Sequence, residues 1–143
     1  MTIRNLQKKD AGEVKFLIMQ LTQNIIEPED LVKRIEGLLK QKNSQFLVAE
    51  KDNKVVGFGG LVWYTIPSKG LIAWAEELVV DSQYRKQGIG KALMENILKL
   101  AQQKKARQIK LTSTAGAKGL YESLGFIKKD HEYLVKFIKS VKK

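Results

Sequence analysis

The sequence contains no cysteine and a single histidine, His131. Without cysteine, the chain has no disulfide framework, no thiolate zinc site and no cysteine nucleophile. One histidine also excludes a cluster of histidine metal ligands, and we expect no metal site. Any chemistry on this chain must therefore proceed without a cysteine side chain and without a cluster of histidine metal ligands.

Long hydrophobic runs are missing as well. No stretch approaches the ~18–20 apolar residues of a membrane-spanning helix, and the N-terminus lacks the apolar segment of a signal peptide. We therefore expect a cytoplasmic protein that does not enter a membrane. With 143 residues, 43% of them hydrophobic, residues 1–143 fit one globular domain with a substantial core.

Acidic residues are scarce relative to basic ones, 15 against 26, which gives a net charge of +11. A nucleic-acid-binding protein would carry such charge in a basic groove with interleaved aromatic residues. Arginine is the usual fork for bases and phosphates. Most basic residues here are scattered lysines, and the arginines are only Arg4, Arg34, Arg85 and Arg107. We interpret the charge as a solvated surface that aids solubility and attracts an anionic cofactor, and this interpretation argues against a nucleic-acid partner.

The strongest pattern lies in residues 71–103. An apolar run, 71–80, is interrupted only by Glu76 and Glu77, and a polar turn follows at 81–90. A helical period then places one set of residues on a common face: Ile89, Ala92, Leu93, Asn96, Ile97, Leu100 and Ala101. The order of strand, glycine-containing turn and helix predicts a helix N-terminus just beyond the end of a strand.

A helix N-terminus of this kind favours an anionic ligand. Its first N–H groups are unpaired and it carries the positive end of the helix dipole. Gly88 and Gly90 lack the Cβ atoms that would keep a ligand away. Arg85, Lys86 and Lys91 add positive charge around the same point. The sequence therefore predicts a pyrophosphate bound on bare backbone.

Two other glycine motifs do not fit. A P-loop needs glycine where Arg85 stands and serine or threonine where Ala92 stands. A dinucleotide-binding fingerprint needs a third glycine in place of Leu93. The turn is therefore neither a P-loop nor a Rossmann glycine turn.

Arg85-x-x-Gly88-x-Gly90 resembles the acetyl-CoA signature of the GNAT N-acetyltransferase superfamily. A second segment, Leu120 to Phe126, looks like that family's Tyr-Glu-x-x-Gly-Phe motif. The resemblance covers roughly residues 2–138. It implies an enzyme that moves an acetyl group from acetyl-CoA to a primary amine by direct attack in a ternary complex, and it makes a homodimer possible.

The remaining pattern predicts the order of elements. Asp10 is placed to cap the first helix, and Pro28 suits the first turn of the second. We expect strands at 2–6, 45–51, 54–66, 71–80 and 107–112, helices at 11–21, 28–42, 89–103 and 115–124, and a final hairpin at 126–137. This order matches the single-domain α/β GNAT fold, with a mixed, mostly antiparallel sheet flanked by helices and splayed parallel central strands. Gly57, Gly59 and Gly60 mark either a bulge or close backbone approach, or simple packing against a helix.

The resemblance implies how acetyl-CoA would bind. The cofactor would lie where strands 71–80 and 107–112 splay apart, and Thr114 would partly replace a family asparagine. The backbone of Leu78, Val79 and Val80 would pair with the pantetheine arm as an added strand, although these residues also suit a plain core strand. Main-chain N–H groups would bind the pyrophosphate at Lys86, Gln87, Gly88, Ile89, Gly90 and Lys91.

Tyr121 lies in the second motif, and the resemblance implies that it protonates the departing CoA thiolate. A phenol with a pKa near ~10 is able to serve as acid to a thiolate whose conjugate acid has a pKa near ~8.5. The alternative is a buried tyrosine that packs between helix and sheet, with its hydroxyl bonded to the backbone.

Glu76 and Glu77 are acids in an otherwise apolar strand, and we expect one of them to accept the proton of the amine directly or through water. Successive strand residues point to opposite faces. Glu77 would then share a face with Val79, and Glu76 with Leu78 and Val80. The sequence does not choose between the two, and each also suits an exposed surface position.

Other readings remain. Trp63, Tyr64 and Trp74 would line an acceptor pocket or, as strand aromatics more often do, belong to the core. A non-catalytic acetyl-CoA-binding module would keep 85–91 without needing Tyr121 or the acids. A small basic nucleic-acid-binding protein would show steeply salt-dependent affinity. The identity of the amine acceptor does not follow from the sequence.

Overall fold

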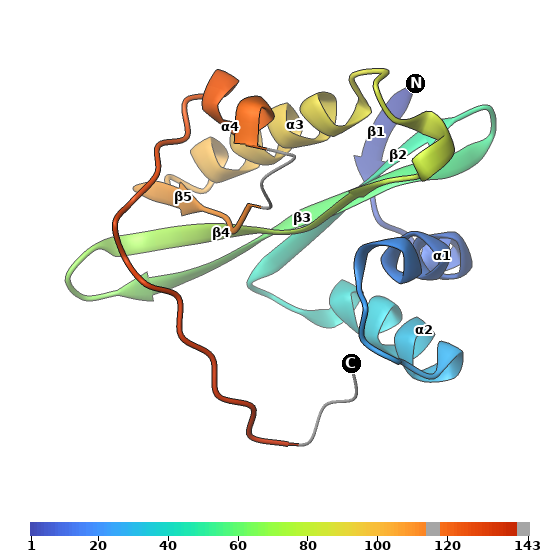
Figure 1. The fold of residues 1–143 in the computed structure, drawn as a ribbon, viewed down its shortest axis with the longest axis horizontal. Coiled ribbons are helices and arrows are strands. Elements are labelled where there is room, and N and C mark those ends of the chain that lie inside the picture. The colour runs from blue at the N-terminus through green and yellow to red at the C-terminus, as the bar shows by residue number, and fades with distance from the viewer. Residues whose placement is uncertain (114–117, 140–143) are drawn as a thin grey trace.

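A computed structural model describes residues 1–113 and 118–139 (Figure 1). Its strands form one sheet in the order β1-β2-β3-β4-β5. Neighbouring strands are antiparallel except β4 and β5, which are parallel. The strands are β1 (Thr2–Asn5), β2 (Ser44–Lys51), β3 (Lys54–Ile66), β4 (Gly70–Val80) and β5 (Gln108–Lys110), and the helices are α1 (Ala11–Leu21), α2 (Pro28–Gly37), α3 (Ile89–Gln103) and α4 (Lys118–Ser123).

Helices cover both faces of the sheet. Figure 1 shows α3 and α4 on one face and α1 and α2 on the other. On the α3 face, Leu93 and Ile97 pack with Leu47 and Leu61 in one buried cluster. On the α1–α2 face, the core contains a second set of buried side chains, which includes Leu17, Leu31, Phe46, Phe58 and Val79. The predicted α/β class with a mixed, mostly antiparallel sheet is confirmed.

Several expected boundaries shift. The second helix begins at Pro28 as predicted, but its α-helical part ends at Gly37 and a 3-10 turn covers 38–40. β5 has only three residues instead of the six expected. The start of the expected helix at 115–124, together with Thr114, lies outside the described residues, and α4 begins at Lys118. On α3, Met94 is fully buried, which the apolar period did not indicate.

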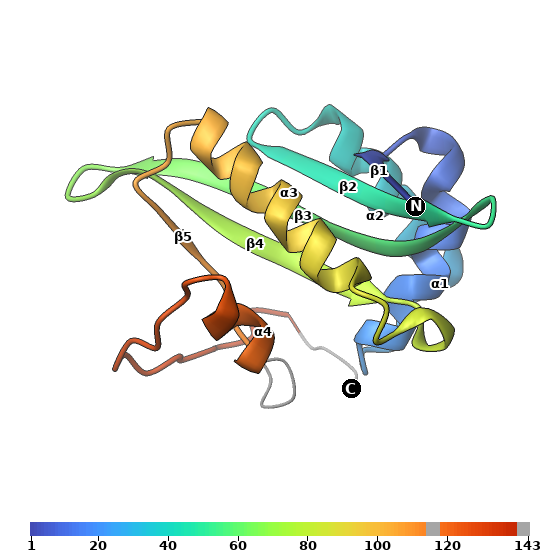
Figure 2. The ribbon, with the colours of Figure 1, turned by 90° about the horizontal axis from the view of Figure 1, so that it is seen from above.

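The predicted hairpin at 126–137 is wrong. These residues form neither strand nor helix. They leave α4 and pass outside β5 toward the side of the sheet that α2 covers (Figures 1 and 2). A hairpin is marginal unless it joins a sheet, and β5 offers an edge of only three residues. Among the described residues β5 is therefore the edge strand, and the parallel pair does not lie at the centre of the sheet.

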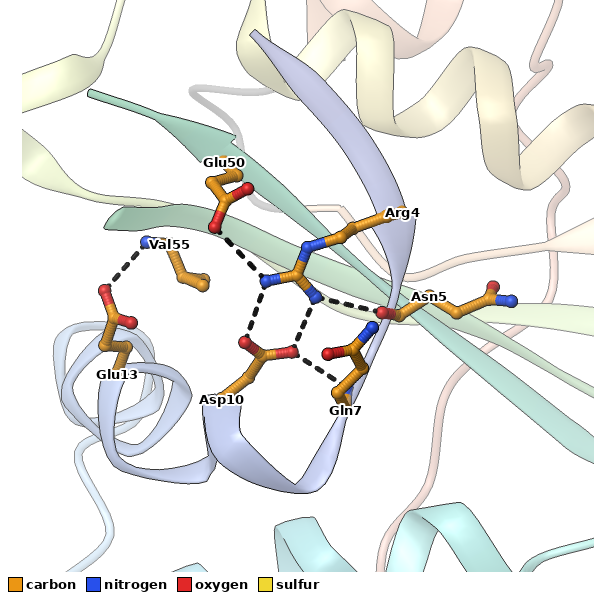
Figure 3. Close-up of polar contacts among 7 residues, drawn as sticks. All are labelled: Arg4, Asn5, Gln7, Asp10, Glu13, Glu50 and Val55. Atoms are coloured by element: carbon orange, nitrogen blue, oxygen red, sulfur yellow. Dashed lines mark hydrogen bonds and ion pairs between the residues drawn. The ribbon is translucent and has the colours of Figure 1, made fainter. Parts of the chain in front are cut away.

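The predicted capping role of Asp10 is also wrong, because its carboxylate does not bond to the first turn of α1. Instead it accepts hydrogen bonds from both Nη atoms of Arg4, at 2.8 and 2.9 Å, and from the Gln7 N–H at 2.8 Å (Figure 3). The Arg4 guanidinium also reaches Glu50 at 3.4 Å. Arg4 binds both carboxylate oxygens of Asp10, and this bidentate contact is stronger than a bond to a helix N–H group. The cluster of Arg4, Asp10 and Glu50 therefore links β1 and β2 to the start of α1.

The glycines of β3 are explained by close packing. A Cβ at Gly60 would overlap the ring of Phe46, and one at Gly57 would lie 2.9 Å from Cδ1 of Leu93. A Cβ at Gly59 would lie 3.0 Å from Cδ1 of Leu78. The missing side chains leave room for the Phe46 ring on one face of the sheet and for α3 on the other.

Candidate functional site

A gap opens where β4 and β5 stop pairing. Their register ends at Trp74 opposite Lys110. From Ala75 to Val80, β4 keeps β3 as its neighbour and has no strand on its other side among the described residues. Strand β4 therefore carries a free backbone edge that leads toward the N-terminus of α3.

The hydrogen-bond pattern shows which backbone groups face this gap. Asp81 N–H donates to Val56 O at 2.8 Å, so the neighbouring pair Gly57–Val80 is the non-hydrogen-bonded kind in an antiparallel ladder. The Val80 backbone therefore points away from β3, and that of Val79 points toward it. Consistently, Arg85 Nε reaches across to Val80 O at 3.3 Å.

The turn after β4 leaves backbone N–H groups accessible at the start of α3. Gly88 adopts a left-handed conformation (φ 80°), as does Lys86 (φ 62°). The Ala92 N–H makes the first backbone bond of α3, to Gly88 O at 3.0 Å. The preceding N–H groups at the helix start are thus available to a ligand. At Gly90 even an added Cβ would stay 3.6 Å from Val80 Cγ2.

Side chains hold this turn from several directions. Asp81 is buried, and its Oδ1 accepts from Gln83 N–H at 3.1 Å. Ile89 is buried in the α3 core. Lys51 Nζ donates to Gln87 Oε1 at 2.6 Å. Arg85, Lys86 and Lys91 remain exposed around the helix start.

The expected placement of the two acids is wrong, because β4 contains a bulge. Phe58 pairs with Val79 while Gly60 pairs with Glu76, so two β4 residues, Glu77 and Leu78, stand opposite one β3 residue. Glu77 lies in the bulge with φ 60°. Each extra residue reverses the side-chain alternation beyond it. Glu76 therefore shares a face with Val79, not with Leu78 and Val80.

Cluster membership supports this assignment. Val79 packs in the core on the α1–α2 face, whereas Leu78 and Val80 pack with α3. Glu76 and Glu77 are both exposed.

Desolvation through partial burial raises the pKa of Glu76 above its ordinary value. Desolvation, with a smaller contribution from the charge of Glu76, raises the pKa of Glu77. Both carboxylates are thus better proton acceptors than a fully solvated glutamate.

Tyr121 lies on the opposite face of β4. It packs at the margin of the α3 cluster that also includes Leu78 and Val80. Its ring meets Phe126 edge to face, with centroids 5.9 Å apart. No hydrogen bond of its hydroxyl is found within residues 1–113 and 118–139, so the expected alternative of a backbone-bonded phenol is not seen there. Burial raises the pKa of Tyr121, which keeps the phenol protonated.

The helix that carries Tyr121 stands beside the start of α3. A Cβ at Gly90 would lie 4.0 Å from Cδ2 of Leu120. The structure thus gathers the α3 turn, the free edge of β4 and α4 into one region. Glu76 lies across the sheet from Tyr121, on the face of Trp74.

The three strand aromatics separate into two groups. Trp63 lies at the margin of the α3 cluster under the Lys104 ammonium, 4.6 Å from its ring centre. Trp74 Nε1 donates to the Tyr64 hydroxyl at 3.0 Å, and Lys110 Nζ lies 5.5 Å from the Trp74 ring centre. Sequence reasoning missed Lys110, since a lysine at the end of a short strand has no distinguishing signal.

In the described part of the chain, no group of three potential metal ligands gathers. No described helix is long and apolar enough to cross a membrane.

Comparison with known proteins finds the acetyltransferase (GNAT) domain at residues 42–128. Human N-acetyltransferase 8 is 35% identical over 105 residues, which are 69% of this chain and 45% of that protein. A putative ribosomal protein bS18-alanine N-acetyltransferase of Bacillus subtilis is 30% identical over 91 residues, covering 62% of this chain and 57% of that protein. The chain thus matches less than two thirds of either relative.

Solved structures agree on the fold. A Trypanosoma brucei acetyltransferase superposes with a TM-score of 0.81 at 23% identity, covering 95% of this chain and 99% of that one. Glucosamine-6-phosphate N-acetyltransferase from Arabidopsis thaliana gives 0.82 at 21% identity, with 96% and 98% covered. The domain match over 42–128 and the shared fold together show that this chain belongs to the GNAT acetyltransferase family.

Proposed function

We propose that this protein is an N-acetyltransferase that moves an acetyl group from acetyl-CoA to a primary amine by direct attack in a ternary complex. The observation that carries the proposal is the continuity of two backbone surfaces. The free edge of β4 from Ala75 to Val80 leads into the unpaired N–H groups at the start of α3.

These surfaces match the two halves of the cosubstrate. The pyrophosphate would be held by the N–H groups of residues 86–91, where Gly88 and Gly90 leave the backbone bare and Arg85, Lys86 and Lys91 supply charge. The amide-rich pantetheine arm would add to the free β4 edge, chiefly through Val80 and the bulged residues. One protein of the same fold, a predicted acetyltransferase from Clostridium acetobutylicum (TM-score 0.77, 16% identity), was solved with acetyl-CoA bound.

The proposed proton acceptor and proton donor lie on opposite faces of β4. Acetyl-CoA supplies a thioester whose carbonyl carbon the amine attacks. Glu76, on the face shared with Trp74, accepts the proton of the ammonium, which frees the nitrogen lone pair. Tyr121, on the α3 face, donates a proton to the thiolate as the carbon–sulfur bond breaks, and the second proton of the nitrogen, lost as the amide forms, returns to the phenolate. A backbone N–H on the free edge of β4 beside Val79, whose own N–H faces β3, would stabilise the oxyanion, and positioning would supply much of the rate. The absence of cysteine favours direct attack over a thiol relay.

Calorimetric titration with acetyl-CoA tests the cosubstrate. We expect binding by the wild-type chain that is lost in the Gly88→Val/Gly90→Val double variant, with CoA and ATP as comparison ligands. Gly12→Val is the matched control, because a Cβ there meets no atom within 4 Å. No binding to wild type, or equal binding by the double variant, would contradict the proposal. Binding without acetylation of any amine in a panel would identify a non-catalytic module instead.

We also propose that the protein forms a homodimer through residues 126–138. In this segment large apolar side chains are exposed, and such surfaces mark interaction sites: Ile127, Tyr133, Leu134, Val135 and Ile138. A second copy would cover them, and each copy offers the same β5 edge. Sedimentation equilibrium should give twice the chain mass for wild type and a shift to monomer for Leu134→Lys/Ile138→Lys. A wild-type monomer at ~100 µM would rule the dimer out.

A further inference from the structure

Two lysines stand opposite each other at the end of the β2–β3 hairpin. Asp52 and Asn53 form its turn, with φ 53° and 61°, and Lys51 and Lys54 are the register pair next to it. Directly paired strand residues place their side chains on the same face, where like charges repel. Neither lysine is in a salt bridge within residues 1–113 and 118–139, so other groups accommodate the two charges.

Both lysines contact the turn that leads into α3. Lys51 Nζ donates to Gln87 Oε1 at 2.6 Å, and Lys54 Nζ lies 5.2 Å from the centre of the Tyr84 ring. An amide oxygen and an aromatic face are neutral groups that attract an ammonium. The hairpin end therefore reaches residues 84–87, although 36 positions separate Lys51 from Gln87 in the sequence.

The contacted part of the turn has a backbone that requires support. Lys86 has φ 62° and Gly88 has φ 80°, and Gln87 lies between them. Glycine adopts positive φ freely, but a residue with a side chain is strained there. Such a conformation persists only where the surrounding structure holds it. The Lys51–Gln87 bond acts on the residue directly after the strained one.

The two ends of the turn are held by different parts of the β2–β3 hairpin. At the end next to β4, Asp81 N–H donates to Val56 O at 2.8 Å. At the end next to α3, the bond from Lys51 holds Gln87, directly before Gly88. The hairpin thus fixes the turn on both sides of the segment whose N–H groups are accessible.

We propose that Lys51 is a positioning residue for acetyl-CoA. Through Gln87 it holds the backbone of residues 86–88 in the observed left-handed conformation, which leaves N–H groups accessible to the pyrophosphate. Groups that are ordered before the ligand arrives lose less conformational freedom on binding, so the affinity is higher. The inference rests on the proposed use of acetyl-CoA and adds to that site a residue from outside the glycine motif.

Calorimetric titration with acetyl-CoA tests the proposal in a double-mutant cycle of Lys51→Met, Gln87→Ala and the two combined. Each single variant should weaken binding about fivefold. The combined variant should bind no more weakly than the single ones, because both changes remove the same contact. Lys51→Arg should restore most of the affinity, since arginine also donates to an amide oxygen. Lys33→Met, which removes an exposed charge on α2, is the matched control.

Steady-state kinetics give a second readout. In Lys51→Met the KM for acetyl-CoA should rise while kcat stays within a factor of about two, because the residue touches no reacting atom. Wild-type affinity in Lys51→Met, or an equal loss in Lys33→Met, would overturn the inference. So would a loss from Lys51→Met that is as large in the Gln87→Ala background as in the wild type, since Lys51 would then act by its charge alone.

A measurement on the ligand-free protein separates this inference from the proposed function. Relaxation of the ¹⁵N-labelled amides of Gln87 and Gly88 should give order parameters of about 0.85 in the wild type and about 0.6 in Lys51→Met. Failure of the wild type to bind acetyl-CoA would contradict the proposed function. The fall in order parameters would in that case still support the hold of Lys51 on the turn, and unchanged order parameters would contradict it.

Discussion

Glu76 and Val79 lie on the same face of the sheet although three positions separate them in the sequence. In a regular strand these two side chains would point to opposite faces. The bulge at Glu77 and Leu78 adds the residue that restores them to one face. It also bends the strand at the point where β5 no longer pairs with β4. Glu76 thereby faces the aromatic side of the site rather than the α3 side.

The first prediction concerns the proton acceptor. Glu76→Gln should lower kcat about 10²-fold or more, because glutamine cannot accept the proton. Glu77→Gln should have a smaller effect, since Glu77 lies in the bulge and not at a regular position on the face that Glu76 shares with Trp74. Steady-state kinetics at saturating acetyl-CoA measure both. A larger fall in kcat for Glu77→Gln than for Glu76→Gln would assign the base to Glu77 and contradict our assignment.

The pH profile gives an independent check on the same residue. The raised pKa of Glu76 means that the carboxylate forms only at a pH above the ordinary glutamate range near ~4.3. Activity of the wild type should therefore rise with pH through that raised value. Glu76→Gln should lose this limb of the kcat profile. A limb that persists unchanged in Glu76→Gln belongs to another group.

Tyr121→Phe tests the proton donor. Removal of the hydroxyl should lower kcat about 10–10²-fold while acetyl-CoA affinity stays within a factor of about three. The free energy of unfolding should change by less than about 1 kcal/mol, since no described partner of the hydroxyl is lost. Chemical denaturation and calorimetry serve as the controls. Unaltered kcat at all pH values would remove Tyr121 from the mechanism.

The Arg4–Asp10 cluster should make stability depend on pH (Figure 3). Burial by itself raises the pKa of Asp10, but bonds from Arg4 and the Gln7 N–H outweigh it, and the pKa is lowered. Because the folded pKa lies below the unfolded value near ~3.9, the stabilisation is present above pH ~4 and is lost as pH falls through the folded pKa. Asp10 is 2% exposed and Arg4 20%, so the pair is only partly screened.

We therefore expect Asp10→Asn to reduce the free energy of unfolding by about 2–3 kcal/mol at pH 7, less than the ~3–5 of a fully buried pair. Urea unfolding measured at pH 7 and near pH 3 should show the difference between wild type and variant shrink at the lower pH. The surface variant Asp30→Asn is the control. A difference that stays constant across this range would mean that the ion pair contributes nothing specific.

Gly60 is predicted to tolerate no side chain. Gly60→Ala would force its methyl group into the ring of Phe46, which stacks on Phe58 with centroids 5.3 Å apart. Overpacking of this kind costs about 1–3 kcal/mol of unfolding free energy. Gly12→Ala, on α1 with open space around it, should instead be neutral or stabilise by up to about 1 kcal/mol. Equal stability of the two variants in urea would show that Phe46 moves aside without cost.

The sequence by itself determined the parts of the fold that follow from local signals. The alternating and continuous apolar runs predicted β2, β3 and β4, and the helical period predicted α3 with its glycine-marked start. The motif around Arg85 and Gly88 indicated the family, which the domain match bears out. Each of these features depends on residues close together in the sequence, so the segment itself contains the information needed to infer it.

Only the tertiary structure decided the features that depend on pairing partners. The bulge at Glu77 is a mismatch between β3 and β4, and no pattern within β4 alone places it. Asp10 binds Arg4 instead of capping α1, because the turn before α1 brings its carboxylate back to β1. The expected hairpin at 126–137 did not form, because β5 offers an edge of only three residues for it to pair with. The position of Lys110 over the Trp74 ring likewise exists only because β4 and β5 pair as far as Trp74.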